Sequence, residues 1–126
     1  MRAKPRFVRP HSGFGNYVPL RRSTGRHNEG VFVSVATIVE FDGATFSEEQ
    51  YWAVTDKLGL RNKLPEGCEY HIAGFDPAKG LRICESWNSE EAFVKFSREI
   101  LAPACQEAGI PAPSKVTVMP LIRHTA

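Results

Sequence analysis

The sequence lacks the features that mark secreted, disulfide-bonded and membrane proteins. It has only three cysteines among 126 residues, an odd number without CxxC spacing, so neither a disulfide framework nor a zinc ribbon is indicated. It contains no run of about eighteen apolar residues, which argues against a membrane-spanning helix, and no apolar core of a secretion signal near its amino terminus. These absences predict buried free thiols in a reducing compartment, and therefore a cytoplasmic protein.

The sequence also has little net charge, but its charges are unevenly distributed. The formal net charge is +2, whereas residues 1–30 alone hold seven Lys and Arg side chains against one acid. Residues 31–126 hold nine basic and thirteen acidic side chains, which predicts a mildly acidic domain behind a basic leader. A single domain is expected for a chain of this length.

The leader, residues 1–30, has few apolar side chains and is interrupted by proline and glycine, which predicts disorder. Three roles stay open for it. It can be an extension without a function of its own, a basic arm that touches nucleic acid or an anionic surface, or an organelle-targeting segment.

The first half of the domain alternates as a strand and then takes a helical pattern. Odd positions in Val31–Phe41 are mostly β-branched, so this side of the strand is predicted to pack on helices. Ser47 and Gln50 form a capping box at the start of a helix, and Gly59 ends it. The residues predicted to face inward from this helix are Tyr51, Trp52, Thr55 and Leu58.

The second half begins with a hairpin and ends with a further helix and strand. The stretches Cys68–Phe75 and Leu81–Trp87 have the pattern of two strands joined by a five-residue turn. Asn88 is predicted to cap the second helix, which Pro103 breaks or kinks because proline removes a backbone donor, and a further turn is expected to carry on to Gly109. Lys115–Arg123 alternates as the last strand.

The resulting β-α-β-β-α-β order predicts an α+β fold, a ferredoxin-like antiparallel sheet with both helices on one face. In a single copy the other face would stay uncovered and expose more apolar surface than soluble monomers tolerate. We therefore predict that two copies pair sheet to sheet as a homodimer.

The same strand order occurs in RNA-recognition modules, which carry stacking aromatic residues on the third strand after a Lys/Arg-Gly pair. Here Lys79 and Gly80 are followed by Leu81 and Arg82, and the strand also carries the acid Glu85. Because the domain is net negative as well, nucleic acid is not an expected partner, except through the basic leader.

Four short stretches resemble one known superfamily. They are His71–Gly74, Glu85–Phe93, Leu101–Pro103 and Gly109–Pro111. With them, residues 31–126 resemble the small stand-alone dimeric α/β-barrel proteins, which include the antibiotic-biosynthesis monooxygenases. The resemblance implies two ferredoxin-like protomers packed sheet to sheet, with room inside the barrel for a small organic ligand. It also implies a range of activities, among them cofactor-independent oxygenases, cyclases and haem-degrading proteins.

Four residues of the predicted hairpin form the candidate site. Pairing the two strands places His71, Glu69, Glu85 and Trp87 on one face, predicted to be the face away from the helices, because Glu85 against the helices would be a costly buried charge. His71 is the candidate general base, Glu85 can orient its ring, and Trp87 can stack on an aromatic ligand. Glu69, Trp87, Met119 and Arg123 are the predicted ligand-binding residues, and His71 and Glu85 the predicted catalytic ones.

Each of these residues also has a purely structural interpretation. His71 can be a satisfied histidine at the dimer interface, Glu85 can form a salt bridge to Arg82 or Arg123, and Trp87 can be core packing. No histidine or cysteine spacing suits a metal site, and no cofactor is expected, although a haem could use His71 as an axial ligand.

Two functions are compatible with these residues. The first is a protein that binds a small organic ligand, such as an aromatic compound, in the barrel without catalysis. The alternative, which the resemblance implies, is a cofactor-independent monooxygenase or cyclase that acts on a small aromatic or polyketide-like compound with His71 as general base. In that case the substrate anion reacts with oxygen without a bound cofactor.

Overall fold

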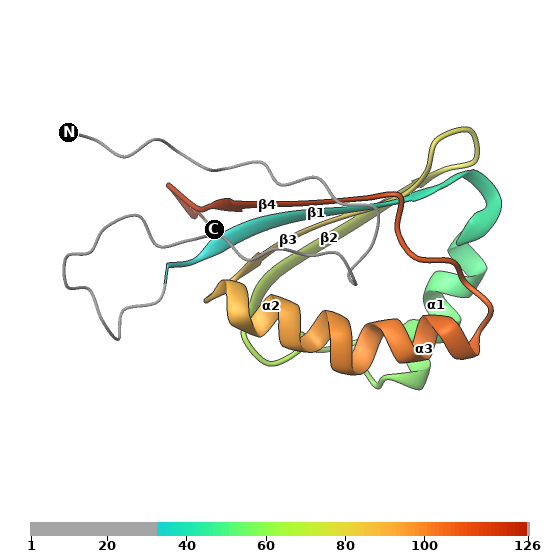
Figure 1. The fold of residues 1–126 in the computed structure, drawn as a ribbon, viewed down its shortest axis with the longest axis horizontal. Helices are drawn as coiled ribbons and strands as arrows, with labels where there is room; N and C mark the ends of the chain where they lie inside the picture. Colours follow the sequence, from blue (N-terminus) through green and yellow to red (C-terminus); the bar gives the residue numbers. More distant parts are fainter. Residues whose placement is uncertain (1–32, 126) are drawn as a thin grey trace.

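The computed structural model describes residues 33–125, so the predictions for the leader at residues 1–30 lie outside the described residues. The predicted α+β fold is confirmed. A four-stranded antiparallel sheet in the order β2-β3-β1-β4, which is the ferredoxin-like order, carries all its helices on one face (Figure 1). The strands are β1 (Val35–Asp42), β2 (Cys68–Asp76), β3 (Gly80–Trp87) and β4 (Lys115–Pro120), and the helices are α1 (Glu48–Lys57), α2 (Glu90–Phe96) and α3 (Ala102–Glu107).

The odd residues of β1 form the centre of the core, as the alternation predicted. Val35, Thr37, Val39 and Phe41 are each at most 3% exposed, and they face the helices. The register extends this face across the sheet, because β1 pairs with β3 and β4 without a shift. The strand itself begins at Val35, later than the predicted start at residue 31, which lies outside the described residues.

Among the described residues, no helix lies over the opposite face of the sheet (Figure 1). Tyr70 and Ile72 of β2 are 51% and 48% exposed, and Cys84 of β3 is exposed between them and β1. At one end of this face Arg82 Nε lies 3.1 Å from Glu40 Oε1. We call this surface the open face of the sheet.

The predicted capping box of α1 is present. The Ser47 hydroxyl accepts a hydrogen bond from the Gln50 amide, and the Gln50 side chain accepts one from the Ser47 amide. The most buried residue of α1 is Val54, at 5% exposed, whereas the predicted inward residue Trp52 is 38% exposed. Trp52 lies at the edge of the helix because the stripe is centred on Val54, one turn from Tyr51 and Leu58.

The second helix differs from its prediction at its start. Its cap is Ser89, whose hydroxyl accepts a hydrogen bond from the Ala92 backbone amide at 3.1 Å. Asn88, the predicted cap, instead donates its backbone N–H to the Gly67 carbonyl. A π-helical turn, Ser97–Leu101, joins α2 to α3, so Pro103 falls in the first turn of α3. Pro103 lacks an amide donor, and it lies just after the π-helical turn, where the helix departs from the regular pattern of hydrogen bonds. The helical run continues past Pro103 to Glu107, close to the predicted end at Gly109.

The β2–β3 hairpin depends on Asp76 and Gly80. The Asp76 carboxylate accepts from the Ala78 and Lys79 amides, which closes the turn. Gly80 has φ +100°, and a Cβ there would lie 2.1 Å from the Phe41 carbonyl oxygen. Glycine is thus required where the hairpin passes β1. None of the described helices is long and apolar enough to cross a membrane.

Candidate ligand-binding site between the sheet and α1

A cavity of about 410 Å³ lies on the helix side of the sheet. Its walls come from α1, the loop after α1, strands β2 and β3, and the helical run from α2 to α3. Most of the wall is apolar, contributed by Phe46, Val54, Leu58, Ile83, Phe96 and Leu101. The volume and the lining are typical of sites that hold a small organic molecule.

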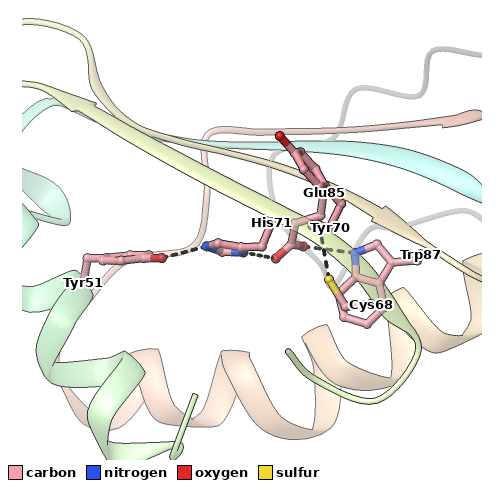
Figure 2. A network of polar contacts seen from close by, with 6 residues as sticks. All are labelled: Tyr51, Cys68, Tyr70, His71, Glu85 and Trp87. Atoms are coloured by element: carbon pink, nitrogen blue, oxygen red, sulfur yellow. Dashed lines mark hydrogen bonds and ion pairs between the residues drawn. The ribbon is translucent and has the colours of Figure 1, made fainter. Parts of the chain in front are cut away.

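One end of the cavity carries a chain of hydrogen bonds that links four residues (Figure 2). Tyr51 Oη lies 2.7 Å from His71 Nε2, and His71 Nδ1 lies 2.6 Å from Glu85 Oε2. Trp87 Nε1 donates to the other carboxylate oxygen, Glu85 Oε1, at 3.0 Å. Tyr51 comes from α1, His71 from β2, and Glu85 and Trp87 from β3, so the chain ties the helix to the sheet.

The chemistry of these groups gives the direction of each hydrogen bond. An indole N–H only donates and a carboxylate only accepts, so Glu85 accepts from Trp87 and from the Nδ1–H of His71. With the proton on Nδ1, the Nε2 atom of a neutral imidazole is an acceptor, and it receives the hydroxyl of Tyr51. In the neutral ring the acceptor nitrogen of His71 thus faces Tyr51, and both residues line the cavity.

The surroundings keep Tyr51 protonated. Burial raises the pKa of Tyr51 above its ordinary value, the negative charge of Glu85 raises it further, and a hydrogen bond with Thr55 opposes the shift. A protonated phenol can donate to His71, which agrees with the direction of the chain. The oxygen of that phenol can also accept a hydrogen bond from a ligand donor.

The predicted orientation of this site was wrong. His71 pairs with Glu85 across the β2–β3 hairpin, and Glu85 pairs with Thr37, so all three lie on the helix face rather than away from the helices. The Glu85 side chain is only 9% exposed, which makes an unpaired carboxylate costly there. Both of its oxygens accept hydrogen bonds, and these offset the cost. Glu85 therefore bonds to His71, and not to Arg82 or Arg123.

The other predicted site residues do not join His71 and Glu85 at the cavity. Trp87 is fully buried against Phe93 and Phe96, so it supports Glu85 from behind and does not line the cavity. Met119 pairs with Ala36 on the open face, and Arg123 is exposed beyond β4, where its Nε donates to Thr125. Glu69 is exposed at the point where the register between β2 and β3 shifts.

Tyr51 is a site residue that the sequence pattern did not reveal. It was predicted only as an inward residue of α1, because no local pattern connects it with His71, twenty residues away. The packing of α1 against β2 creates the pair. The loop residues Arg61 and Lys63, which also line the cavity, were not singled out either.

Cys68 lies near Glu85 but is not a reactive thiol, and the described residues form no metal site. Burial, aided by Glu85, raises the pKa of the Cys68 thiol to about 12, so Cys68 is a poor nucleophile. Its thiol donates to the Tyr70 carbonyl (Figure 2). Among residues 33–125, no group of three or more His, Cys, Asp or Glu side chains is arranged to hold a metal ion.

Comparison with known proteins supports the fold. No protein-family model matches the chain, and no curated protein matches it significantly. A solved structure, "Structure of Rv0793 from Mycobacterium tuberculosis", is similar at a TM-score of 0.52 and 21% sequence identity, covering 74% of this chain and 99% of that one. At this identity the similarity shows that the two chains share a fold, the small antiparallel sheet with helices on one face.

Proposed function

We propose that the cavity binds a small, largely apolar organic molecule whose one hydroxyl meets Tyr51 and His71. The observation that carries this proposal is the uneven lining: an apolar wall closed at one end by the hydrogen-bonded chain of Tyr51, His71 and Glu85. Contacts with an apolar wall add to the affinity but do not fix the orientation of the ligand, which a few polar groups determine. An aromatic or enolic hydroxyl fits this end, because it can donate to Tyr51 Oη.

Binding can be tested with 2-naphthol, a bicyclic phenol, and with naphthalene, which has the rings but no hydroxyl. We expect 2-naphthol to raise the melting temperature and naphthalene to do so less. Tyr51→Phe removes the hydroxyl that meets the ligand and should weaken 2-naphthol binding severalfold with little change in fold. Tyr70→Phe is the matched control, because Tyr70 lies on the open face. Equal 2-naphthol affinity for both variants would contradict the proposed orientation.

A second candidate function, a proton-abstracting enzyme, is favoured by one further observation. The Nδ1 atom of His71 is held by the Glu85 carboxylate, which orients the ring and stabilises an imidazolium if Nε2 takes a proton. The ligand hydroxyl would give its proton to Tyr51 Oη while the Tyr51 proton passes to His71 Nε2. The ligand becomes an anion, Tyr51 is unchanged, and the imidazolium lies beside Glu85. This is the first step that an oxygenase or cyclase of the resembled kind requires.

The base role is tested by the absorption spectrum of bound 2-naphthol, because the naphtholate anion absorbs at longer wavelength than the neutral phenol. At neutral pH we expect a naphtholate signal in the wild-type complex and its loss in His71→Gln, with binding retained. His124→Gln is the control, because His124 lies in the exposed tail after β4. If bound 2-naphthol stays neutral in the wild type, the protein binds the ligand but does not abstract its proton.

A further inference from the structure

The cavity has a second polar region, on the solvent side. Three consecutive residues of the loop after α1, Arg61, Asn62 and Lys63, line the cavity and are exposed, so they mark its mouth. Apart from His71, the charged residues in the lining are Arg61, Lys63 and Glu85. The Glu85 side chain is only 9% exposed, and its two oxygens accept hydrogen bonds from His71 and Trp87. The charged side chains that a ligand can reach are therefore those at the mouth.

Arg61 is held in place by two neighbours. Its Nε and Nη2 atoms donate to the two oxygens of the Asp56 carboxylate at 2.7 and 2.9 Å, and its guanidinium lies 4.3 Å from the centre of the Trp52 ring. This pairing uses one edge of the guanidinium and leaves the Nη1 donors for another acceptor. Trp52 in turn contacts Tyr51 at 5.2 Å between ring centres. The two separations place the guanidinium within about 10 Å of the Tyr51 ring.

Lys63 gives the mouth its net positive charge. Asp56 balances Arg61, but among the described residues no ion pair or hydrogen bond engages the Lys63 ammonium. Lys63 also lines the two neighbouring hollows, and its side chain is long and flexible. An anion that enters the cavity therefore meets one uncompensated cation and one guanidinium with free donors.

We infer that the ligand of this cavity is an organic acid, with its carboxylate at the mouth beside Lys63 and Arg61 and its hydroxyl at Tyr51 and His71. The inference rests on the proposed function and adds the substrate class to it. The ring of Trp52 contacts both Tyr51 and Arg61, which suits a flat ring system with a hydroxyl at one end and a carboxylate at the other. The cationic mouth also draws an anionic ligand toward the opening from solution.

The test compares 6-hydroxy-2-naphthoic acid with 2-naphthol, which differ by the carboxylate, in direct binding to the full chain at low salt. We expect the acid to bind about tenfold more tightly, and Lys63→Gln to remove most of that advantage, with a smaller effect on the affinity for 2-naphthol than on that for the acid. Raising the salt to about 0.5 M should reduce the advantage in the wild type, because exposed charges are screened. Lys95→Gln is the matched control, because Lys95 lines a neighbouring hollow but not this cavity.

Each remaining outcome overturns a distinct statement. If neither compound binds, the proposed function fails. If both bind equally, or if Lys63→Gln and Lys95→Gln reduce the affinity for the acid alike, the carboxylate does not sit at this mouth and the organic-acid inference alone fails. If His71→Gln abolishes the advantage of the acid while Lys63→Gln leaves it, the carboxylate lies at the inner end and the inference is again wrong.

Discussion

The two faces of the sheet are built from the same four strands but differ in the side chains that they carry and in what covers them. On the helix face, the odd residues of β1 and β3 pack against α1 and the α2–α3 run, and the one carboxylate among them, Glu85, has a partner on each oxygen. On the open face, Tyr70 and Ile72 are half exposed, and the ion pair of Arg82 and Glu40 lies at one end. The buried face thus carries a paired carboxylate, while the open face carries exposed apolar side chains.

This contrast shows where a hydrophobic pattern is a poor guide to a site. A carboxylate inside a core is unfavourable by itself, but much of the cost is offset when donors are already in place. A half-exposed isoleucine or tyrosine on a strand costs little, yet it leaves apolar surface for another molecule. Substitutions on the two faces test the contrast, and they are ordered below by the expected change in stability of the chain.

The largest loss is expected on the helix face, from Trp87→Ala. Trp87 is fully buried between Phe93, Phe96 and the Glu85 carboxylate, so its removal deletes core volume and one donor. We expect the free energy of unfolding to fall by about 3–5 kcal/mol, measured by urea titration. Trp52→Ala should cost far less, since Trp52 is 38% exposed. Similar losses for both variants would mean that Trp87 is not the central core residue.

An intermediate loss is expected from Glu85→Ala, which leaves the His71 and Trp87 N–H groups without an acceptor. An unpaired buried donor costs about 1–3 kcal/mol, and Trp87 Nε1 is the fully buried one of the two, so the free energy of unfolding should fall by about that range. Glu85→Gln keeps an acceptor and should lose less. On the open face, Glu40→Ala breaks a partly exposed ion pair and should cost no more than about 1 kcal/mol. If Glu40→Ala proves the more damaging variant, the contrast between the faces is wrong.

Alkaline pH is also expected to lower the stability, because two thiols are buried on the helix side. Burial raises the pKa of Cys68 to about 12 and that of Cys105 to about 11, while unfolded thiols ionise near 9.0. Above pH 9 the unfolded chain loses thiol protons that the folded chain keeps, so the free energy of unfolding falls as the pH rises toward 11. The double variant Cys68→Ala, Cys105→Ala should show a shallower decline over this range. An unchanged slope would show that the thiols titrate alike in both states.

The smallest change in the stability of a single chain, with the largest change in self-association, is expected from Ile72→Glu. Ile72 is half exposed on the open face, so a charge there should alter the unfolding free energy of the monomer by about 0.5 kcal/mol or less. The predicted homodimer pairs this face with a second copy, so the same charge should dissociate it in sedimentation. Ala78→Glu, in the hairpin turn, is the control. A wild type that sediments as a monomer at micromolar concentration would end the dimer prediction.

Much of the fold was predictable because its signals are local. The capping box of Ser47 and Gln50, the alternation of β1 and the hairpin before Gly80 each act over a few residues. The second helix was harder, since Asn88 and Ser89 are both good caps and the chain path at Gly67 decides between them. Pro103 was expected to break or kink the helix before a further turn, and a π-helical turn directly before α3 is the irregularity that the structure has there.

For the site, His71 and Glu85 could be proposed as partners because they face each other across a hairpin whose register the turn sets. Tyr51 could not be found, because its contact with His71 depends on how α1 packs against β2. Trp87 was predicted to bind the ligand, because an aromatic residue beside a candidate base can either stack on a ligand or pack in the core. Its complete burial shows that it packs in the core.

By itself, the sequence determined the element order, the strand that carries the core and the pairing of His71 with Glu85, since backbone geometry and short-range hydrogen bonding dictate these. Only the tertiary structure decided that this pair lies beneath the helices, that Tyr51 completes it, and that Arg61 and Lys63 open onto the same cavity. The physical reason is that a strand has two faces with the same periodicity. Which face receives the helices depends on the free energy of the whole packed core, including the donors that stabilise a buried carboxylate.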